Sequence, residues 1–240
     1  MDEYKITKVK KIKCINKVLI ELNTLLNFYL NKKNRIKKIN DRLIFLAKKD
    51  RNLFGKFFDA AQCLPSLHAL SDSLLDDIRK IYKFKIIQIA DFPKLRLDLP
   101  EKNSKHNDPW HQEAMAYDAP RDSITAWLPL VNMRKDVGRL EIKGETKKIG
   151  LLKHSLYKKK PYIRVNKGDW EKLPSLKFYV PYGSFIAFNN AVPHKSSKNI
   201  SKNKVRISVQ VRYNFLDNSI YKKENYKPTV PKAQSVQEVD

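Results

Sequence analysis

Cysteine is nearly absent from this sequence of 240 residues, which contains only Cys14 and Cys63. The two lie far apart and outside any Cys-x-x-Cys or mixed Cys/His spacing, so neither a disulfide framework nor a structural zinc site is indicated. The chain is long enough to bury a hydrophobic core without covalent cross-links. We therefore expect one folded domain with a helical appendage in a reducing compartment, the cytoplasm.

Long apolar runs are also absent. Lys, Asn or Asp interrupts every apolar segment well before it reaches the length that crosses a membrane. The first residues, Met1-Asp2-Glu3-Tyr4, are not a basic stretch followed by an apolar run. The sequence therefore predicts neither a signal peptide nor a transmembrane helix. Hydrophobic residues still make up 42% of the chain and aromatic residues 10%, which is typical of a globular protein.

Acidic residues are scarce relative to basic ones. The 25 Asp and Glu residues face 49 Lys and Arg residues, which gives a formal net charge of +24. Such an excess attracts phosphates, anionic lipid or acidic metabolites. The lysines are scattered from Lys5 to Lys232 instead of forming a stripe between aromatic residues, so a nucleic-acid partner is not favoured. A basic nucleic-acid-binding protein is kept as an alternative, which a steep salt dependence of binding would identify.

The spacing of apolar residues divides the chain into two parts. Between Ile15 and about Lys83 they recur at intervals of three and four, which predicts helices with breaks at residues 31–40 and around Pro65. Ser71 and Ser73 have side chains suited to capping a helix N-terminus. We therefore assign residues 1–84 to an N-terminal helical layer.

After residue 84 the hydrophobic period changes to two, and short β-rich runs alternate with Pro and Gly. The expected strands are residues 86–90, 94–99, 123–131, 139–142, 176–180, 184–188 and 205–215. Many short strands with irregular loops favour an antiparallel sandwich or jelly roll over residues 85–216. Residues 217–240 are polar and contain two prolines, so we expect a loosely ordered C-terminal tail.

The most informative stretch is Trp110-His111-Gln112-Glu113. In an extended segment, His111 and Glu113 project from the same side, where both can bind one metal ion. His194 is the candidate third ligand, because it follows the apolar run 185–188, where a strand would deliver a side chain to the mouth of a barrel. Two histidines and one carboxylate form a facial triad that leaves positions open on a ferrous ion. Zinc hydrolases share such ligands. The other histidines, His68, His106 and His154, have no ligand-like neighbours, and we assign them no role.

Two expected strands offer polar faces to a common site. Residues 206–213 alternate almost strictly, and the polar face consists of Arg206, Ser208, Gln210 and Arg212. In the strand over 123–131, one face consists of Ser123, Thr125 and Trp127. This pattern is typical of a closed β domain that surrounds a hydrated cavity.

Four blocks of the sequence together resemble the phytanoyl-CoA dioxygenase-like branch of the Fe(II)- and 2-oxoglutarate-dependent oxygenases. They are WHQE at 110–113, TAWLPL at 125–130, GRLEIKGETKK at 138–148 and YGSFIAFNNAVPHKSSKNISKNKVRISVQVRY at 182–213. The blocks occur in the family's order, and their combination is more specific than any one of them. The resemblance implies a mainly β fold, a double-stranded β-helix (jelly roll) with an N-terminal helical layer. It also implies a dioxygenase that hydroxylates a C–H bond of a small substrate.

The resemblance extends to single residues. It implies that His111, Glu113 and His194 bind iron. A family Arg about a dozen residues past the distal His binds the distal carboxylate of the cosubstrate 2-oxoglutarate, and Arg206 lies twelve residues past His194. The expected pocket for the cosubstrate also includes Gln112, Trp127, Thr125, Ser208 and Arg96. Arg212 shares the face of Arg206, and we expect it to be structural or to face the substrate.

Two departures from the family pattern concern the acidic ligand and a turn. The ligand is usually Asp, and Glu113 adds a methylene, so its carboxylate must approach by a different rotamer or from a backbone set further back. The segment GETKK stands where the family usually has Gly-Ser-His-Lys, so a turn histidine that does not bind iron is missing.

The expected substrate class follows from charge, and one further alternative concerns the chemistry. The basic excess, with Arg96 and Arg121 near the expected mouth of the barrel, favours an anionic small molecule. The alternative is a cupin-type metal-dependent isomerase or dioxygenase that does not use 2-oxoglutarate. Its usual His-x-His pattern is absent, since position 113 is Glu.

Overall fold

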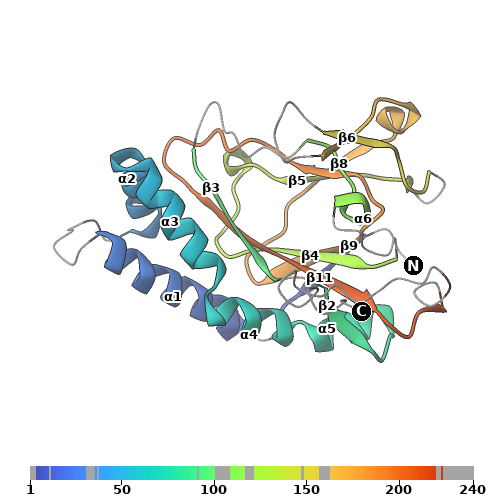
Figure 1. The fold of residues 1–240 in the computed structure, drawn as a ribbon, viewed down its shortest axis with the longest axis horizontal. Coiled ribbons are helices and arrows are strands. Elements are labelled where there is room, and N and C mark those ends of the chain that lie inside the picture. Colours follow the sequence, from blue (N-terminus) through green and yellow to red (C-terminus); the bar gives the residue numbers. More distant parts are fainter. Residues whose placement is uncertain are drawn as a thin grey trace, which may run out of the picture.

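The computed structural model describes residues 4–10, 12–30, 36, 38–90, 92–100, 109–116, 122–146, 149–156, 163–219 and 223. His106, Arg121 and most of the expected C-terminal tail lie outside these residues. Two β-sheets face each other, and helices cover the outer side of the larger sheet (Figure 1). No helix in the described ranges combines the length and the apolar character that crossing a membrane requires.

Five helices occupy most of the first 84 residues, as the apolar spacing predicts. They are α1 (Ile12–Leu30), α2 (Ile39–Lys49), α3 (Arg51–Gln62), α4 (Pro65–Ser73) and α5 (Leu75–Tyr82). Pro65 starts α4, where its missing N–H needs no intrahelical partner. The expected caps are wrong. Ser71 and Ser73 donate to carbonyl oxygens inside α4, at 2.9 and 2.7 Å, and the start of α5 has no side-chain cap.

The helical layer does not begin at residue 1. Residues Tyr4–Lys8 form strand β1, which pairs antiparallel with β9 (Ser184–Asn189) and places Ile6 opposite Ile186. The five residues YKITK alternate too briefly for their period to identify a strand. Their conformation is set by the edge of β9, whose backbone groups β1 satisfies.

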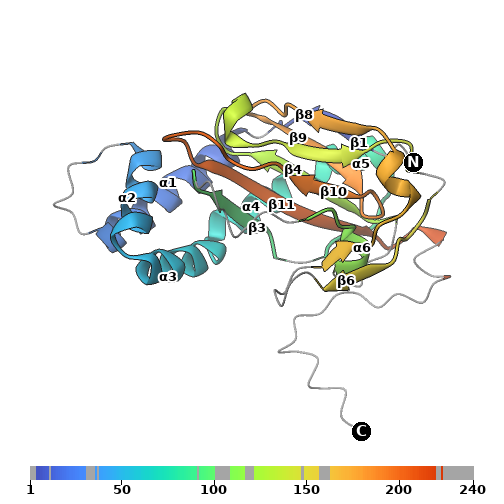
Figure 2. The same cartoon turned by 90° about the horizontal axis from the view of Figure 1, so that it is seen from above.

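The larger sheet has the order β1-β9-β4-β11-β2, and β3 also pairs with β11. The strands not yet given are β2 (Ile87–Ile89), β3 (Lys94–Asp98), β4 (Ile124–Pro129) and β11 (Arg206–Phe215). The smaller sheet has the order β10-β5-β8, with β5 (Leu140–Lys143), β8 (Ser175–Phe178) and β10 (His194–Ser196). All of these pairings are antiparallel. After β4 the chain enters the smaller sheet for β5 and β8, returns to the larger one for β9, and then contributes β10 and β11 to the smaller and the larger sheet in turn (Figure 2). This is the double-stranded β-helix that the sequence predicts.

Each expected strand is present with its ends shifted by no more than a few residues. A separate hairpin, β6 (His154–Leu156) with β7 (Ile163–Val165), was not expected, and neither was β10. Each of these strands is three residues long, which is too short for alternation to be recognised.

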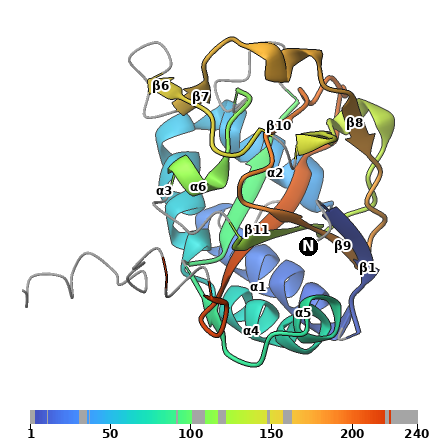
Figure 3. The same cartoon turned by 90° about the vertical axis from the view of Figure 1, so that its right-hand side faces the viewer.

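Apolar and polar side chains alternate along β11, so they lie on opposite faces of the larger sheet. Ile207, Val209 and Val211 pack with the helices in one core cluster, on the side where α1, α4 and α5 lie (Figure 3). The opposite face carries polar side chains and is directed at the smaller sheet. A second apolar cluster fills part of this space, where Trp127 packs with residues of both sheets, among them Leu140 and Ile142.

The end of the β-helix core extends slightly into the expected tail. The Asp217 carboxylate accepts hydrogen bonds from the backbone N–H groups of Lys85 and Ile86 at 2.8 and 3.2 Å. These bonds hold the pKa of Asp217 below its ordinary value. The exposed Asp217, the first residue of the expected tail, is therefore tied to the segment that leads into β2.

Candidate active site

Two segments that are distant in sequence meet at the candidate metal site. The backbone N–H of His111 donates to the carbonyl of His194 at 3.1 Å, and the N–H of His194 donates back to the carbonyl of His111 at 2.9 Å. This isolated antiparallel bridge holds the two imidazole rings with their centroids 4.3 Å apart. Glu113 follows at the start of the short helix α6 (Glu113–Ala116).

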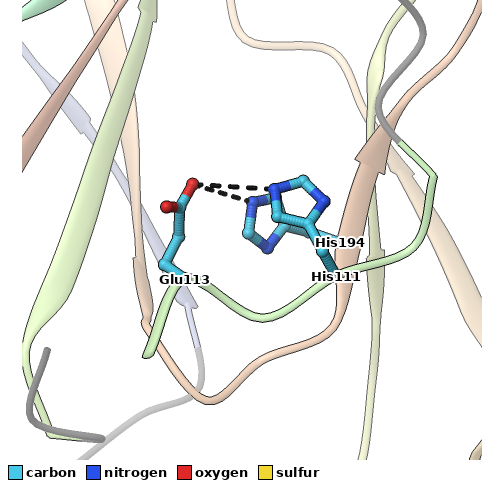
Figure 4. Close-up of side chains that lie close together, drawn as sticks. All are labelled: His111, Glu113 and His194. Atoms are coloured by element: carbon cyan, nitrogen blue, oxygen red, sulfur yellow. Dashed lines mark ion pairs between the residues drawn. The ribbon is translucent and has the colours of Figure 1, made fainter. Parts of the chain in front are cut away.

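The three expected ligands converge on one point. Glu113 Oε1 lies 3.8 Å from His111 Nε2 and 3.3 Å from His194 Nε2, and one ligand atom from each residue lies within 4.8 Å of the others. Figure 4 shows both ring nitrogens facing the same carboxylate oxygen. The spacing suits three donors placed about 2.0–2.2 Å from a common ion.

Hydrogen bonds on the far side of each ring prepare the histidines for a metal. His111 Nδ1 donates to the carbonyl of Pro109 at 2.8 Å, and His194 Nδ1 donates to that of Val192 at 3.0 Å. With the proton on Nδ1, each Nε2 carries the lone pair through which an imidazole binds a metal. In the described part of the chain, His194 Nε2 is buried without a hydrogen-bond partner. Burying a hydrogen-bond acceptor without a partner costs free energy, and a bound cation would remove that cost. The residues therefore fit a metal ion.

The protonation states at the site are those of metal ligands. Burial alone would raise the pKa of the Glu113 carboxyl, but Arg212, His111 and His194 hold that pKa well below its ordinary value. Burial, assisted by His111, lowers the pKa of His194. The site therefore presents a carboxylate and neutral imidazole near neutral pH, as metal binding requires.

Arg212 forms a two-point ion pair with the acidic ligand. Its Nε and Nη2 atoms lie 2.9 and 2.8 Å from Glu113 Oε2, and both side chains are almost completely buried. Alternation along β11 places Arg212 on the inner face, as expected. The sequence contains no signal for its pairing with Glu113, since 99 residues separate the two.

Gln112 is held by backbone groups of two loops. Its side-chain oxygen accepts from the N–H of Leu152 at 2.8 Å, and its amide donates to the carbonyl groups of Gly150 and Ala191. These bonds fasten the ligand segment to neighbouring loops, and a contact between Gln112 and a cosubstrate stays a prediction. His154, to which we assigned no role, accepts a hydrogen bond from the backbone N–H of Gln112 at 3.1 Å.

Arg206 lies at the other end of β11, where it is buried in an ion pair. Its Nε and Nη2 atoms are 2.9 and 2.8 Å from Asp98 Oδ2, and Arg96 Nη2 is 3.5 Å from the other oxygen of Asp98. Burial would raise the pKa of Asp98, but the two arginines lower it. The structure thus brings together both predicted cosubstrate arginines, around a carboxylate that sequence reasoning missed.

Two polar side chains between the sheets have unused hydrogen-bonding groups. On β11, Ser208 lies opposite Arg96 of β3 on one side and opposite Pro129 of β4 on the other. Its buried Oγ has no hydrogen-bond partner within the described ranges. Thr125 Oγ1 donates to Asn190 Oδ1 at 2.9 Å, while Asn190 Nδ2 is buried and likewise unpaired in those ranges. Trp127, by contrast, is packed in the second apolar cluster.

Comparison with known proteins identifies the fold. No protein-family model matches the sequence, and no curated protein matches it either. A solved structure described as the apo form of the non-heme monooxygenase ThoJ has a TM-score of 0.59 at 15% identity, over 95% of this chain and 77% of that one. The epimerase SnoN, in complex with Fe3+, alpha ketoglutarate and nogalamycin RO, gives 0.52 at 15% identity, over 88% and 78%.

EvdO2 from Micromonospora carbonacea var. aurantiaca gives a TM-score of 0.51 at 15% identity, over 89% of this chain and 87% of that one. At such identities the likeness shows a shared fold.

Proposed function

We propose that this protein is a non-haem Fe(II)- and 2-oxoglutarate-dependent dioxygenase of the phytanoyl-CoA dioxygenase-like type, which hydroxylates a small organic substrate. The observation that carries the proposal is the convergence of His111, Glu113 and His194, with the buried Nε2 of His194 unpaired in the described residues. The fold supports it, because SnoN, which shares the fold, is described with Fe3+ and alpha ketoglutarate bound.

The three ligands would hold ferrous iron on one face and leave further coordination positions open. When bound, the iron would supply the redox chemistry that consumes oxygen and 2-oxoglutarate and yields succinate, carbon dioxide and an oxidised substrate. The chain's own contribution is to orient the ligands and to limit the access of water. The backbone bridge between His111 and His194 and the packing of Phe188 against the His194 ring, with centroids 4.6 Å apart, serve these purposes.

Arg206, Arg96 and Ser208 would bind the distal carboxylate of 2-oxoglutarate. Asp98 and the carbonyl of Ser197 already contact part of the Arg206 guanidinium. Arg96 and the unpaired Oγ of Ser208 would therefore complete the carboxylate site. Two-point recognition by a guanidinium suits carboxylates as well as phosphates, and a dicarboxylic cosubstrate offers such a group.

Basic side chains between the sheets support an anionic ligand. Among the described residues, the guanidiniums of Arg96, Arg206 and Arg212 contact the carboxylates of Asp98 and Glu113, and the proposed divalent metal would add positive charge. Such surroundings favour an anionic substrate beside the cosubstrate.

Anaerobic titration of the metal-free protein with Fe(II) and then 2-oxoglutarate tests the proposal. We expect a visible metal-to-ligand charge-transfer band that appears only when both are present, and succinate formation when oxygen is admitted. Succinate in place of 2-oxoglutarate is the control and should give no band. Iron binding without the band would favour the cupin-type alternative, and failure to bind iron would remove the metal site itself.

A further inference from the structure

We infer that Arg212 is a positioning residue that restricts Glu113 to one-oxygen binding of the metal and so keeps a coordination position open. The inference rests on the proposed metal site and adds a determinant of its geometry. It starts from the division of the Glu113 carboxylate between two sets of partners. Oε1 faces the ring nitrogens of His111 and His194, whereas Oε2 is contacted by Nε and Nη2 of Arg212.

A carboxylate can bind a metal through one oxygen or through both. Glutamate has one more rotatable bond than aspartate, so it has more freedom to turn its second oxygen toward the ion. In this structure the Arg212 fork holds Oε2 at 2.9 and 2.8 Å. Turning Oε2 to the metal would break both of these charge-assisted contacts inside a buried site, which is strongly unfavourable.

Arg212 is itself fixed by the sheet. Its strand, β11, pairs with β4, where Arg212 lies opposite Thr125. On the other side, the carbonyl of Arg212 accepts from the N–H of Ala90 at 2.9 Å. The guanidinium is thus fastened to an internal strand, and Glu113, at the start of a four-residue helix, is aligned by that strand.

This pairing accounts for Glu at a position where the resembled family usually has Asp. Aspartate is shorter by one carbon–carbon bond, about 1.5 Å, so from the same backbone position it could not reach both the ion and Arg212. Lysine at position 212 would keep the charge but would offer a single point of contact instead of a fork. The pair Glu113 and Arg212 therefore acts as a unit.

The test uses Co(II) in place of iron, added anaerobically without cosubstrate, because its visible absorption reports the coordination number. Arg212→Lys and Arg212→Met should change this spectrum, because a second carboxylate oxygen would replace another ligand of the ion, and the change should be larger in Arg212→Met. We also expect metal binding about 10- to 100-fold weaker in Arg212→Met, the usual effect of removing a group that orients a ligand. Competition with a chelator measures that affinity.

Tyr213→Phe is the matched control. Tyr213 is the next residue of the same strand, and its hydroxyl donates to the carbonyl of Ser71 at 2.8 Å on the helical side of the sheet. The substitution should lower stability without changing the Co(II) spectrum. If Arg212→Met does not fold, Arg212→Lys decides.

The outcomes separate the two proposals. If the wild-type protein binds no Co(II), the proposed metal site fails. If the wild type binds Co(II) and both Arg212 variants keep its spectrum and affinity, the positioning role of Arg212 is overturned. An equal spectral change in Tyr213→Phe would overturn it as well.

Discussion

At the scale of single residues, the site is marked by buried atoms that lack partners. Six buried side-chain nitrogen or oxygen atoms have none among the described residues, and three of these belong to His194, Ser208 and Asn190. Native proteins satisfy nearly all such groups. Their concentration between the two sheets is therefore a property expected of a ligand site, and each of the three atoms can be tested by substitution.

The first prediction concerns the metal ligands. His111→Ala, His194→Ala and Glu113→Gln should each bind ferrous iron at least about tenfold more weakly while staying folded. Glu113→Gln is preferred to Glu113→Ala because it retains a hydrogen-bond acceptor for the buried Arg212 guanidinium. Metal content after dialysis measures the effect. His68→Ala, which changes an exposed histidine, should keep its iron; stoichiometric iron in any of the first three would remove that residue from the site.

The second prediction separates cosubstrate binding from stability. Ser208→Ala should weaken 2-oxoglutarate binding to the ferrous protein about 3- to 10-fold, the value of one hydrogen bond. Its melting temperature should hardly change, because Ser208 Oγ has no partner within the described ranges. Arg206→Ala should have a larger effect, about a hundredfold or more, but it also leaves Asp98 with Arg96 alone. Unchanged 2-oxoglutarate affinity in both variants would contradict the assigned pocket.

The third prediction concerns the dependence of stability on pH. The pKa of Asp98 lies below the ordinary value of an aspartate in the folded protein, because Arg206 and Arg96 outweigh burial. The Asp98 contribution is therefore complete above the unfolded pKa and is lost as pH falls through the lower folded value. In urea unfolding at several pH values, Asp98→Asn should differ most from wild type above pH 4 and least in stronger acid. A difference independent of pH would contradict this.

The site residues that can be predicted from the sequence differ from those that cannot in how far their partners lie along the chain. The motif around His111 and Glu113 and the position of His194 predict three groups that the structure brings together. The pairs that complete the site join strands or loops distant in sequence, such as Arg206 with Asp98, 108 residues apart. Such pairs depend on strand register, which composition and periodicity do not specify.

At the scale of elements, the alternation of β11 is the most predictive feature of the chain. Its expected apolar face packs on the helices, and its polar face is directed between the sheets. The sequence did not predict β1 or the three-residue strands β6, β7 and β10, because their conformation depends on the strands with which they pair and not on their own sequence.

The fourth prediction concerns the turn that leads into β5. Gly138 has φ +83°, and a Cβ there would meet Ser197 O at 2.4 Å and Arg206 Nη1 at 2.9 Å. Gly138→Ala should therefore lower stability by about 1–3 kcal/mol from backbone strain alone, and also weaken 2-oxoglutarate binding by displacing Arg206. Gly150→Ala is the control, since its φ of +59° is strained but nothing lies within 4 Å. Equal 2-oxoglutarate affinity in both variants would argue against the contact with Arg206.

At the scale of the whole molecule, the first residues of the chain close the sheet that carries the site. β1 covers the edge of β9, and Tyr4 packs against Phe178 of the smaller sheet with ring centroids 4.7 Å apart. β1 thus joins both sheets at one edge. β9 in turn carries Phe188, which contacts the ring of His194, so one strand links this edge to the proposed metal site.

The fifth prediction follows from this arrangement. Removing residues 1–8 should expose the edge of β9, whose unpaired backbone groups promote association between molecules. Each lost hydrogen bond should cost about 1 kcal/mol, and each kcal/mol should lower the melting temperature by about 2–4 °C in a chain of this size. Lys5→Ser, which alters only an exposed side chain of β1, should behave as wild type. A shortened protein that stays monodisperse, melts at the wild-type temperature and binds iron equally well would show that β9 is stable without its edge strand.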